Sequence, residues 1–260
     1  MKVACLQLDI CFGDVGANVD YAEKEIEHVM EEERPDVVLL PELWTTGYDL
    51  ERLNVLADED GAVSKRILSD WAKRFEVNIV GGSIAKQTGE LVTNTMYTFN
   101  KKGEQIGEYS KVHLFKLMNE HKFLSSGNEK GDFLLDSTPC AGLICYDIRF
   151  PEWVRTHTAQ GVEVLFIVAE WPLSRLAHWR ILLQARAIEN QCFVVACNRS
   201  GNDTSTTYAG HSMVIDPWGE IIAEAGEKAE NLIATFDVEK IVRVRNKIPV
   251  FEDRRPDLYK

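Results

Sequence analysis

The chain contains the stretch Gly142-Leu-Ile-Cys-Tyr-Asp-Ile-Arg-Phe-Pro-Glu152, in which an apolar strand leads directly into a cysteine and then into a helix start. Pro151 suits the first turn of that helix, because its fixed backbone angle is already helical. A strand that ends at a thiol and gives way to a helix is a common way to present a nucleophile. The stretch therefore predicts a layered α/β fold with a reactive residue at Cys145.

Two charged residues, like Cys145, lie at the end of a strand-like stretch of the sequence. Glu42 ends the apolar stretch Val37-Val-Leu-Leu-Pro-Glu42, and Lys111 follows the strand-like Ile106-Gly-Glu-Tyr-Ser110. Taken singly, a buried cysteine is most often inert and a charged residue at a strand end is most often solvated. At the ends of strands, Glu42 supplies a carboxylate that can act as acid and base, Lys111 an ammonium that can bind an anion, and Cys145 a thiol nucleophile. Together the three residues predict acyl transfer.

The composition is that of a globular protein with an acidic surface. The 260 residues are 45% hydrophobic and carry a formal net charge of −12, and no linker, low-complexity block or repeat divides them. The negative charge argues against nucleic acid as a partner, and an acidic substrate would need a local arginine or lysine. Without a signal peptide or an apolar run of about 18 residues, we expect a cytoplasmic protein with no membrane partner.

The six cysteines follow no pattern and form no C-x-x-C pair, so we expect no disulfide framework. Cys5, Cys192 and Cys197 lie in apolar strand-like runs, which favours small buried thiols. The six histidines show no H-x-x-x-H or H-E-x-x-H spacing. We therefore expect no metal and no organic cofactor. A dinucleotide-binding fold is also disfavoured, because no G-x-G-x-x-G follows the first strand.

Hydrophobic periodicity predicts strands and helices that alternate along the chain. Helices are expected at 19–33, at 64–75, from Pro151 and near 177–190. Strands are expected at 3–8, 37–40, 78–82, 95–99, 106–110, 140–145, 164–169, 193–198, 212–215, 221–225 and 232–237, with a hairpin turn at Asn100-Lys-Lys-Gly103.

Three motifs occur in a fixed order along the chain: Leu39-Leu-Pro-Glu-Leu43, Tyr109-Ser-Lys-Val-His-Leu-Phe115 and Leu143-Ile-Cys-Tyr-Asp-Ile-Arg-Phe-Pro-Glu152. With them the chain resembles the nitrilase superfamily of carbon-nitrogen hydrolases over essentially its whole length. The resemblance implies a four-layer αββα sandwich, in which two six-stranded mixed sheets lie back to back with helices outside. Such subunits pair through helices near the active site and through a C-terminal arm. We expect a hydrolase domain at residues 1–237, and an arm at 238–260 that joins a homodimer or larger homo-oligomer.

The chemistry of amide hydrolysis gives each residue a role. Glu42 would take the thiol proton, hand one to departing ammonia and then activate water, while Lys111 and the backbone N–H of Tyr146 would hold the oxyanion. Glu120 matches a second acidic residue that many members place nearby, and would orient Lys111 or the hydrolytic water; the alternative is a solvated loop carboxylate. His113 is expected to fix the Lys111 loop.

Within the superfamily, the segments 111–121, 170–175 and 197–201 are most similar to ω-amidases, which hydrolyse the distal amide of 2-oxo acids such as 2-oxoglutaramate and 2-oxosuccinamate. Other substrates stay open, among them nitriles, N-carbamoyl compounds and other linear amides. A non-catalytic interaction module on the same scaffold is a further alternative. The intact set of Glu42, Lys111 and Cys145 argues against it.

A 2-oxo acid substrate requires a cation for its carboxylate. Arg175 is the first candidate, with Trp171 as an apolar wall and Tyr48 closing the opposite side. Arg149 is the alternative cation, unless it braces the Cys145 turn through a carboxylate. Glu170 stands where the ω-amidase pattern leads us to expect asparagine, which would alter hydrogen bonding at the pocket rim.

Overall fold

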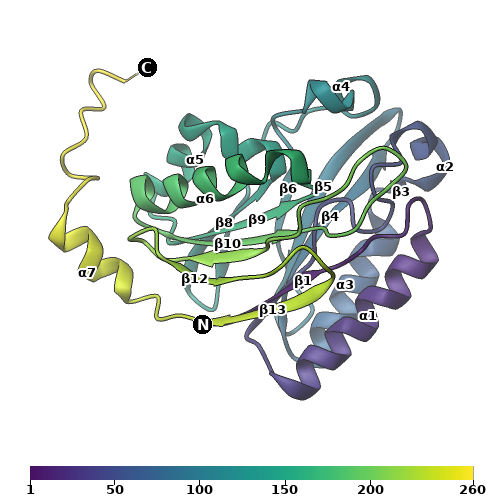
Figure 1. Ribbon diagram of the computed structural model, residues 1–260, viewed down its shortest axis with the longest axis horizontal. Coiled ribbons are helices and arrows are strands. Elements are labelled where there is room, and N and C mark those ends of the chain that lie inside the picture. The colour runs from purple at the N-terminus through teal and green to yellow at the C-terminus, as the bar shows by residue number, and fades with distance from the viewer. Residues whose placement is uncertain (260) are drawn as a thin grey trace.

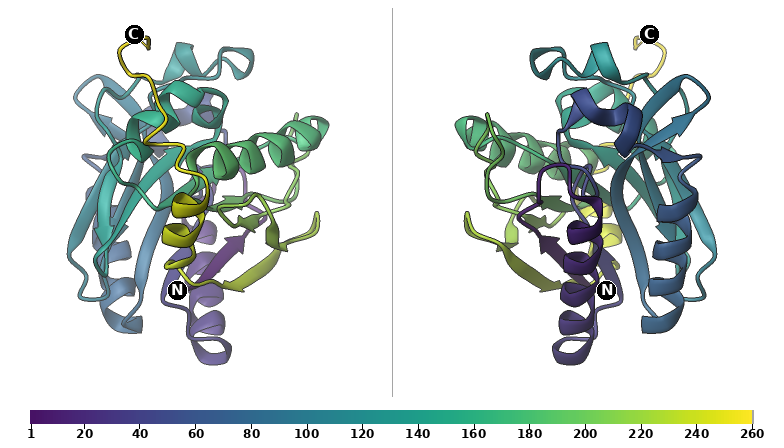
Figure 2. Two further views of the ribbon diagram at one scale, coloured as in Figure 1. Left: turned by 90° about the vertical axis from the view of Figure 1, so that its left-hand side faces the viewer. Right: turned by 90° about the vertical axis from the view of Figure 1, so that its right-hand side faces the viewer.

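Two β-sheets pack face to face in the computed structural model, which describes residues 1–259, and helices cover both outer faces (Figure 1 and Figure 2). One sheet has the order β13(Glu230–Thr235)-β1(Lys2–Gln7)-β2(Val37–Leu39)-β4(Asn78–Thr88)-β5(Leu91–Phe99)-β6(Gln105–Ser110). The other has the order β12(Ile221–Glu224)-β11(Met213–Ile215)-β10(Phe193–Asn198)-β9(Val164–Ala169)-β8(Thr138–Ile144)-β7(Asp132–Leu135). Both sheets contain parallel and antiparallel pairs, so the predicted α/β sandwich is confirmed.

The alternation of side chains along β1 explains the layers. Val3 and Cys5 point into the cluster between the sheets, whereas Ala4 and Leu6 pack with the helices outside. Because successive side chains of a strand point to opposite faces, a strand buried on both sides is largely apolar. The residues of β9 and β10 are all buried, and only Asn198 at the end of β10 is polar.

Helices α1(Val15–Glu32) and α3(Ala62–Phe75) cover the first sheet, and α5(Pro151–Thr158) and α6(Leu176–Asn190) cover the second (Figure 1). Helix α1 begins four residues before the predicted start. Its N-cap Asp14 accepts a hydrogen bond from the backbone N–H of Ala17, which supports an earlier first turn.

Some short elements were not predicted from the sequence. The first sheet has a seventh strand, β3(Asp58–Glu59), which pairs with β4, so the expectation of six strands per sheet is met only by the second sheet. Strands β4 and β5 are both longer than the predicted 78–82 and 95–99, and they form a hairpin that was not predicted, with Gly89 in its turn. The remaining short elements are η1(Leu50–Arg52), α2(Leu53–Leu56), η2(Lys116–Met118), α4(Glu120–Phe123), η3(Cys145–Arg149) and η4(Leu173–Arg175).

The C-terminal segment begins with helix α7(Lys240–Lys247), whose Ile241 and Val244 are buried against the domain. The chain then continues beside α5 as a tail that contains turns, where the Arg155 guanidinium lies 5.1 Å from the Phe251 ring (Figure 1). Of the predicted arm 238–260, residue 260 lies outside the described residues. Among residues 1–259, no helix has both the length and the apolar character needed to cross a membrane.

Candidate active site

Strand direction brings the three predicted reactive residues to one end of the sandwich. Strand β2 is parallel to β4, and two antiparallel pairings then make β6 run the same way as β2. Glu42, three residues after β2, and Lys111, directly after β6, therefore emerge at the same edge. Cys145 follows β8 in the facing sheet. Residues more than 100 positions apart in the sequence thus become neighbours.

Lys111 lies between two carboxylates. Its Nζ is 2.8 Å from Glu42 Oε1 and 2.7 Å from Glu120 Oε1, and all three side chains are fully buried. Glu120, the first residue of α4, is therefore part of the cluster rather than a solvated loop carboxylate. Burial lowers the pKa of Lys111, but Glu120 and Glu42 outweigh burial and hold it well above the usual value. Lys111 is accordingly an ammonium.

Backbone and amide donors fix both carboxylates. Glu42 Oε1 accepts from Asn94 Nδ2 at 2.8 Å, and Glu42 Oε2 accepts from the backbone N–H of Glu170 at 2.9 Å. Glu120 Oε2 accepts from the backbone N–H of Phe115 at 2.7 Å. Asn94 lies inside β5 and no sequence motif pointed to it. Its contact with Glu42 depends on how β5 is placed beside β4.

Tyr48 lies in the carboxylate cluster rather than on the wall of the hollow beside Cys145. Its hydroxyl donates to Glu120 and lies 3.2 Å from Glu42 Oε1. Burial, then Glu120 and Glu42, raise the pKa of Tyr48 well above its usual value. The phenol is therefore a neutral hydrogen-bond donor. This position differs from the expected substrate wall, because Tyr48 points toward the two acids.

Cys145 has an unusual backbone conformation. Its φ is 46°, in the left-handed region that residues other than glycine rarely adopt, and its side chain is 6% exposed. Burial, followed by Glu42, raises the pKa of the Cys145 thiol well above its usual value, and Lys111 only partly opposes this rise. The resting thiol is therefore neutral, and a base must take its proton as the sulfur attacks.

A small hollow opens beside Cys145. It is lined by Phe115, Met118, Cys145, Tyr146, Arg149, Glu170, Trp171, Pro172 and Arg175. The guanidinium of Arg149 lies 4.7 Å from the ring of Trp171, and that of Arg175 lies 5.4 Å from the ring of Phe115. Both predicted cations and the predicted wall Trp171 thus face the same space.

Arg149 does not brace the Cys145 turn through a carboxylate, so that alternative is wrong. Within residues 1–259, its polar contact is to Nδ1 of His178, at 3.3 Å. Burial lowers the pKa of Arg149, and the neighbouring charge of Arg175 adds to this effect. Neither Arg149 nor Arg175 forms an ion pair with a side chain among residues 1–259, and two such guanidinium groups beside one hollow favour an anionic ligand.

Glu170 is fully buried beneath the hollow, where it pairs with Arg199 at 2.8 Å, rather than lying at a rim. Burial raises the pKa of Glu170 to about 7, although Arg199 opposes this rise. The Arg199 side chain also donates to the carbonyl of Ile10 at 2.8 Å. The ion pair therefore supports the loop whose backbone N–H binds Glu42.

We expect the titration of Glu170 to appear in the pH dependence of stability. Because the folded-state pKa is raised, the contribution of Glu170 is fully present below its unfolded pKa and is lost as pH rises through about 7. Relative to Glu170→Gln, the wild-type unfolding free energy should fall by up to about 3 kcal/mol between pH 5 and pH 8. Urea unfolding across this range measures the effect. Glu152→Gln, at an exposed carboxylate, should leave the slope unchanged; parallel curves for wild type and Glu170→Gln would contradict the assignment.

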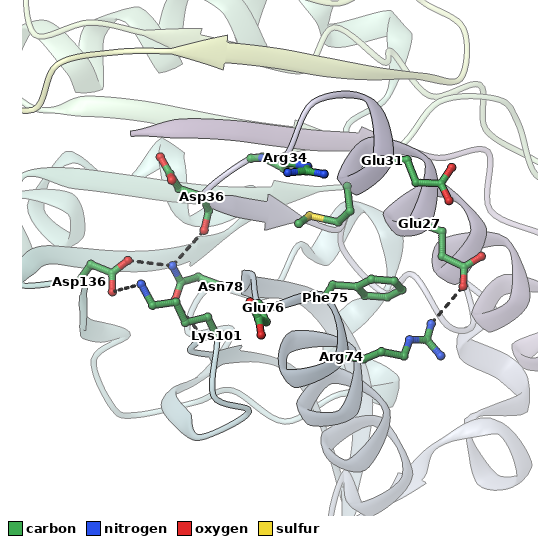
Figure 3. Close-up of a pocket in the computed structure, with 12 residues that line it drawn as sticks. Glu27, Glu31, Arg34, Asp36, Arg74, Phe75, Glu76, Asn78, Lys101 and Asp136 are labelled. Carbon is green, nitrogen blue, oxygen red and sulfur yellow. Dashed lines mark hydrogen bonds and ion pairs between the residues drawn. The ribbon is translucent and has the colours of Figure 1, made fainter.

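A larger pocket of about 680 Å³ lies at the other end of the first sheet, where Asp36 precedes β2 and Asn78 opens β4 (Figure 3). Four of its eight charged side chains form ion pairs with one another: Arg74 contacts Glu27, and Lys101 contacts Asp136. None of Glu42, Lys111 and Cys145 lines this pocket, so it is separate from the site at Cys145. Among residues 1–259, no three or more His, Cys, Asp or Glu side chains are grouped as metal ligands.

The fold and the grouping of Cys145, Glu42 and Lys111 agree with the resemblance to carbon-nitrogen hydrolases. The carbon-nitrogen hydrolase family matches residues 2–246, and the chain belongs to this family. The predicted class, a nitrilase-superfamily enzyme that acts on amides, is thereby confirmed.

Three relatives illustrate this membership. The 2-oxoglutaramate amidase of Bacillus subtilis is 53% identical, and the match covers 99% of this chain and 98% of that protein. The omega-amidase YafV of Yersinia enterocolitica is 33% identical over 97% of this chain and 96% of its own length. The solved structure of XC1258 from Xanthomonas campestris, a CN-hydrolase superfamily protein with an arsenic adduct in the active site, has a TM-score of 0.92 at 29% identity; the match covers 98% of this chain and 97% of that one.

Proposed function

We propose that this enzyme hydrolyses the distal amide of a 2-oxo acid, such as 2-oxoglutaramate or 2-oxosuccinamate, to ammonia and the dicarboxylate. The observation that carries the proposal is the pair Arg149 and Arg175 at the hollow beside Cys145, since they suit a carboxylate at the far end of a short amide. The 53% identity to a 2-oxoglutaramate amidase supports the same substrate.

Acylation begins when the Cys145 sulfur attacks the amide carbon while Glu42 takes the thiol proton. The carbonyl oxygen becomes an oxyanion, which the Lys111 ammonium and the backbone N–H of Tyr146 stabilise. Glu42 then passes the proton to the amide nitrogen, the carbon-nitrogen bond breaks and ammonia leaves. The product is a thioester on Cys145. A base is required because burial keeps the thiol neutral.

Deacylation repeats these steps with water. Glu42 takes a proton from water as the oxygen attacks the thioester carbon, and the same two donors hold the second oxyanion. The carbon-sulfur bond breaks, the thiol recovers its proton from Glu42 and the acid departs. Glu120, 2.7 Å from Nζ, holds Lys111 in place throughout both steps.

We expect Arg175→Gln and Arg149→Gln each to raise KM for 2-oxoglutaramate by roughly 10- to 100-fold, because each removes a charge-assisted hydrogen bond to the carboxylate. A neutral short-chain amide should be affected less than about twofold, since it offers no carboxylate. Steady-state kinetics on both substrates measure the difference. Arg180→Gln is the matched control, because Arg180 pairs with Glu224 and does not line the hollow. Equal losses on the two substrates would contradict the carboxylate role.

The experiment that tests the substrate is ammonia release from 2-oxoglutaramate, measured beside an aliphatic nitrile and an N-carbamoyl amino acid. The proposal predicts turnover of the oxo-amide at a kcat/KM at least about 100-fold above the other two. Preference for the nitrile or the N-carbamoyl compound would contradict the proposed substrate but leave the assignment to carbon-nitrogen hydrolases unchanged.

We also propose that the arm 238–260 and the outer face of α6 join two copies of the chain in the cytoplasm. Ile181 and Ile188 on α6 and Leu258 and Tyr259 on the tail are exposed, which suits a covered interface. Free cysteines suit a reducing compartment. Sedimentation velocity should give about twice the chain mass of 29.5 kDa; a monomer would contradict the pairing.

A further inference from the structure

We propose that Asp147 is a positioning residue that fixes the Cys145 turn to the segment carrying Lys111. Asp147 lies two residues after Cys145 in η3, and it is fully buried. This inference rests on the catalytic roles proposed above for Cys145 and Lys111, but not on the identity of the substrate.

The Asp147 carboxylate joins three segments of the chain. Its Oδ2 accepts the backbone N–H of Ile144 at 3.0 Å and the hydroxyl of Tyr109 at 2.7 Å. Its Oδ1 accepts the backbone N–H of His113 at 3.1 Å and lies 2.7 Å from His113 Nδ1. The end of β8, the end of β6 and the loop after Lys111 therefore meet at one side chain.

These contacts leave Asp147 little freedom. A carboxylate offers about four acceptor positions, and here four groups occupy them. Within residues 1–259 the only basic side chain paired with Asp147 is the His113 imidazole, with no lysine or arginine. Buried charges that lack such hydrogen bonds are costly, so a rotation of Asp147 would lose several bonds at once. The carboxylate thus acts as a rigid connection.

Through its hydrogen bonds, Asp147 links the two chain segments that carry the proposed oxyanion donors. Lys111 lies two residues before His113, and Tyr146 lies immediately before Asp147, so one carboxylate sets the separation of their segments. The backbone of Cys145, with a φ of 46°, is strained and persists only if its surroundings hold it. The hydrogen bond from the Ile144 N–H to Asp147 holds the residue directly before Cys145. A shift of about 1 Å in such an arrangement is enough to lower a rate 100-fold.

Aromatic contacts support the partners of Asp147. The His113 ring stacks on Phe150 with 3.7 Å between centroids, and Trp153 Nε1 donates to the Tyr109 hydroxyl at 3.1 Å. Burial, then Asp147, raise the pKa of Tyr109 well above its usual value. The phenol remains protonated, so it donates to Asp147 at any pH at which the enzyme works.

The test compares Asp147→Asn with Asp132→Asn. Asp132 on β7 forms a similar pair with His157, but it contacts none of the proposed catalytic residues. Asp147→Asn should lower kcat about 100-fold while KM changes less than about threefold, with rates normalised to titrated Cys145 in folded protein. Asp132→Asn should retain kcat within about twofold. An equal loss of kcat in both variants, or none in Asp147→Asn, would overturn the proposal.

Tyr109→Phe keeps the test valid if Asp147→Asn does not fold, because it removes one donor to Asp147 and retains the ring. It should lower kcat about 3- to 10-fold at unchanged KM. Iodoacetamide alkylation of Cys145 provides a readout without substrate, and both variants should slow it severalfold by moving the thiol away from Glu42. If wild type does not turn over 2-oxoglutaramate, the substrate proposal fails while alkylation still tests Asp147. Wild-type alkylation rates in both variants would overturn the positioning role.

Discussion

Replacing Cys145 by alanine should reduce ammonia release by at least about 10,000-fold while the protein stays folded. Without sulfur no thioester forms, and the remaining oxyanion donors cannot supply a nucleophile. The substitution removes a single buried atom at a strained position, so the melting temperature should change little. Ammonia release and thermal unfolding measure the two quantities on the same preparation.

Cys140→Ala is the matched control for this prediction. Cys140 is also a buried thiol on β8, but it contacts the carbonyl of Thr138 rather than Glu42 or Lys111. Its loss should leave kcat within about threefold of wild type, because it only leaves a small cavity. Activity above about 1% in Cys145→Ala, or an equal loss in Cys140→Ala, would contradict the assignment of the nucleophile.

Replacing Lys111 by methionine should damage both stability and catalysis. The substitution leaves Glu42 and Glu120 buried without their shared cation, and breaking a buried ion pair in this way costs roughly 3–5 kcal/mol. It also removes an oxyanion donor, which lowers kcat by about 100- to 1000-fold. Denaturant unfolding and steady-state kinetics measure the two losses separately.

A second substitution separates the two effects of losing Lys111. Adding Glu120→Gln to Lys111→Met removes one of the two like charges, so it should restore part of the stability but none of the activity. Lys116→Met, at an exposed lysine in η2, should change neither quantity. If the double variant were as unstable as the single one, repulsion between the buried carboxylates would not be the cause.

The sequence was most informative where local pattern and tertiary structure agree. Strands β9 and β10 match the predicted bounds 164–169 and 193–198, because β9 is an apolar run between Glu163 and Glu170 and β10 is apolar up to Asn198. Glu42, Lys111 and Cys145 could be predicted together because each comes shortly after a predicted strand. Parallel strands then bring their ends to the same edge.

Other features depend on tertiary contacts that no local pattern encodes. Helix α4 has four residues and no periodicity, yet it buries Glu120 beside Lys111. Asn94 reads as an ordinary strand residue, and only the pairing of β4 with β5 brings it to Glu42. Glu170 was predicted at the rim, but its partner Arg199 comes from the end of β10. Strand pairing decided the position of Asn94, and side-chain direction after a turn decided those of Glu120 and Glu170; the local sequence specifies neither.

The central claim is that amide hydrolysis proceeds through a thioester on Cys145. Its most direct test is intact-protein mass spectrometry after rapid acid quench of the enzyme turning over 2-oxoglutaramate. The account predicts an adduct equal to the substrate minus ammonia, located on the peptide that contains Cys145 and absent from Cys145→Ala. Sustained ammonia release without an adduct, or with undiminished turnover in Cys145→Ala, would contradict it.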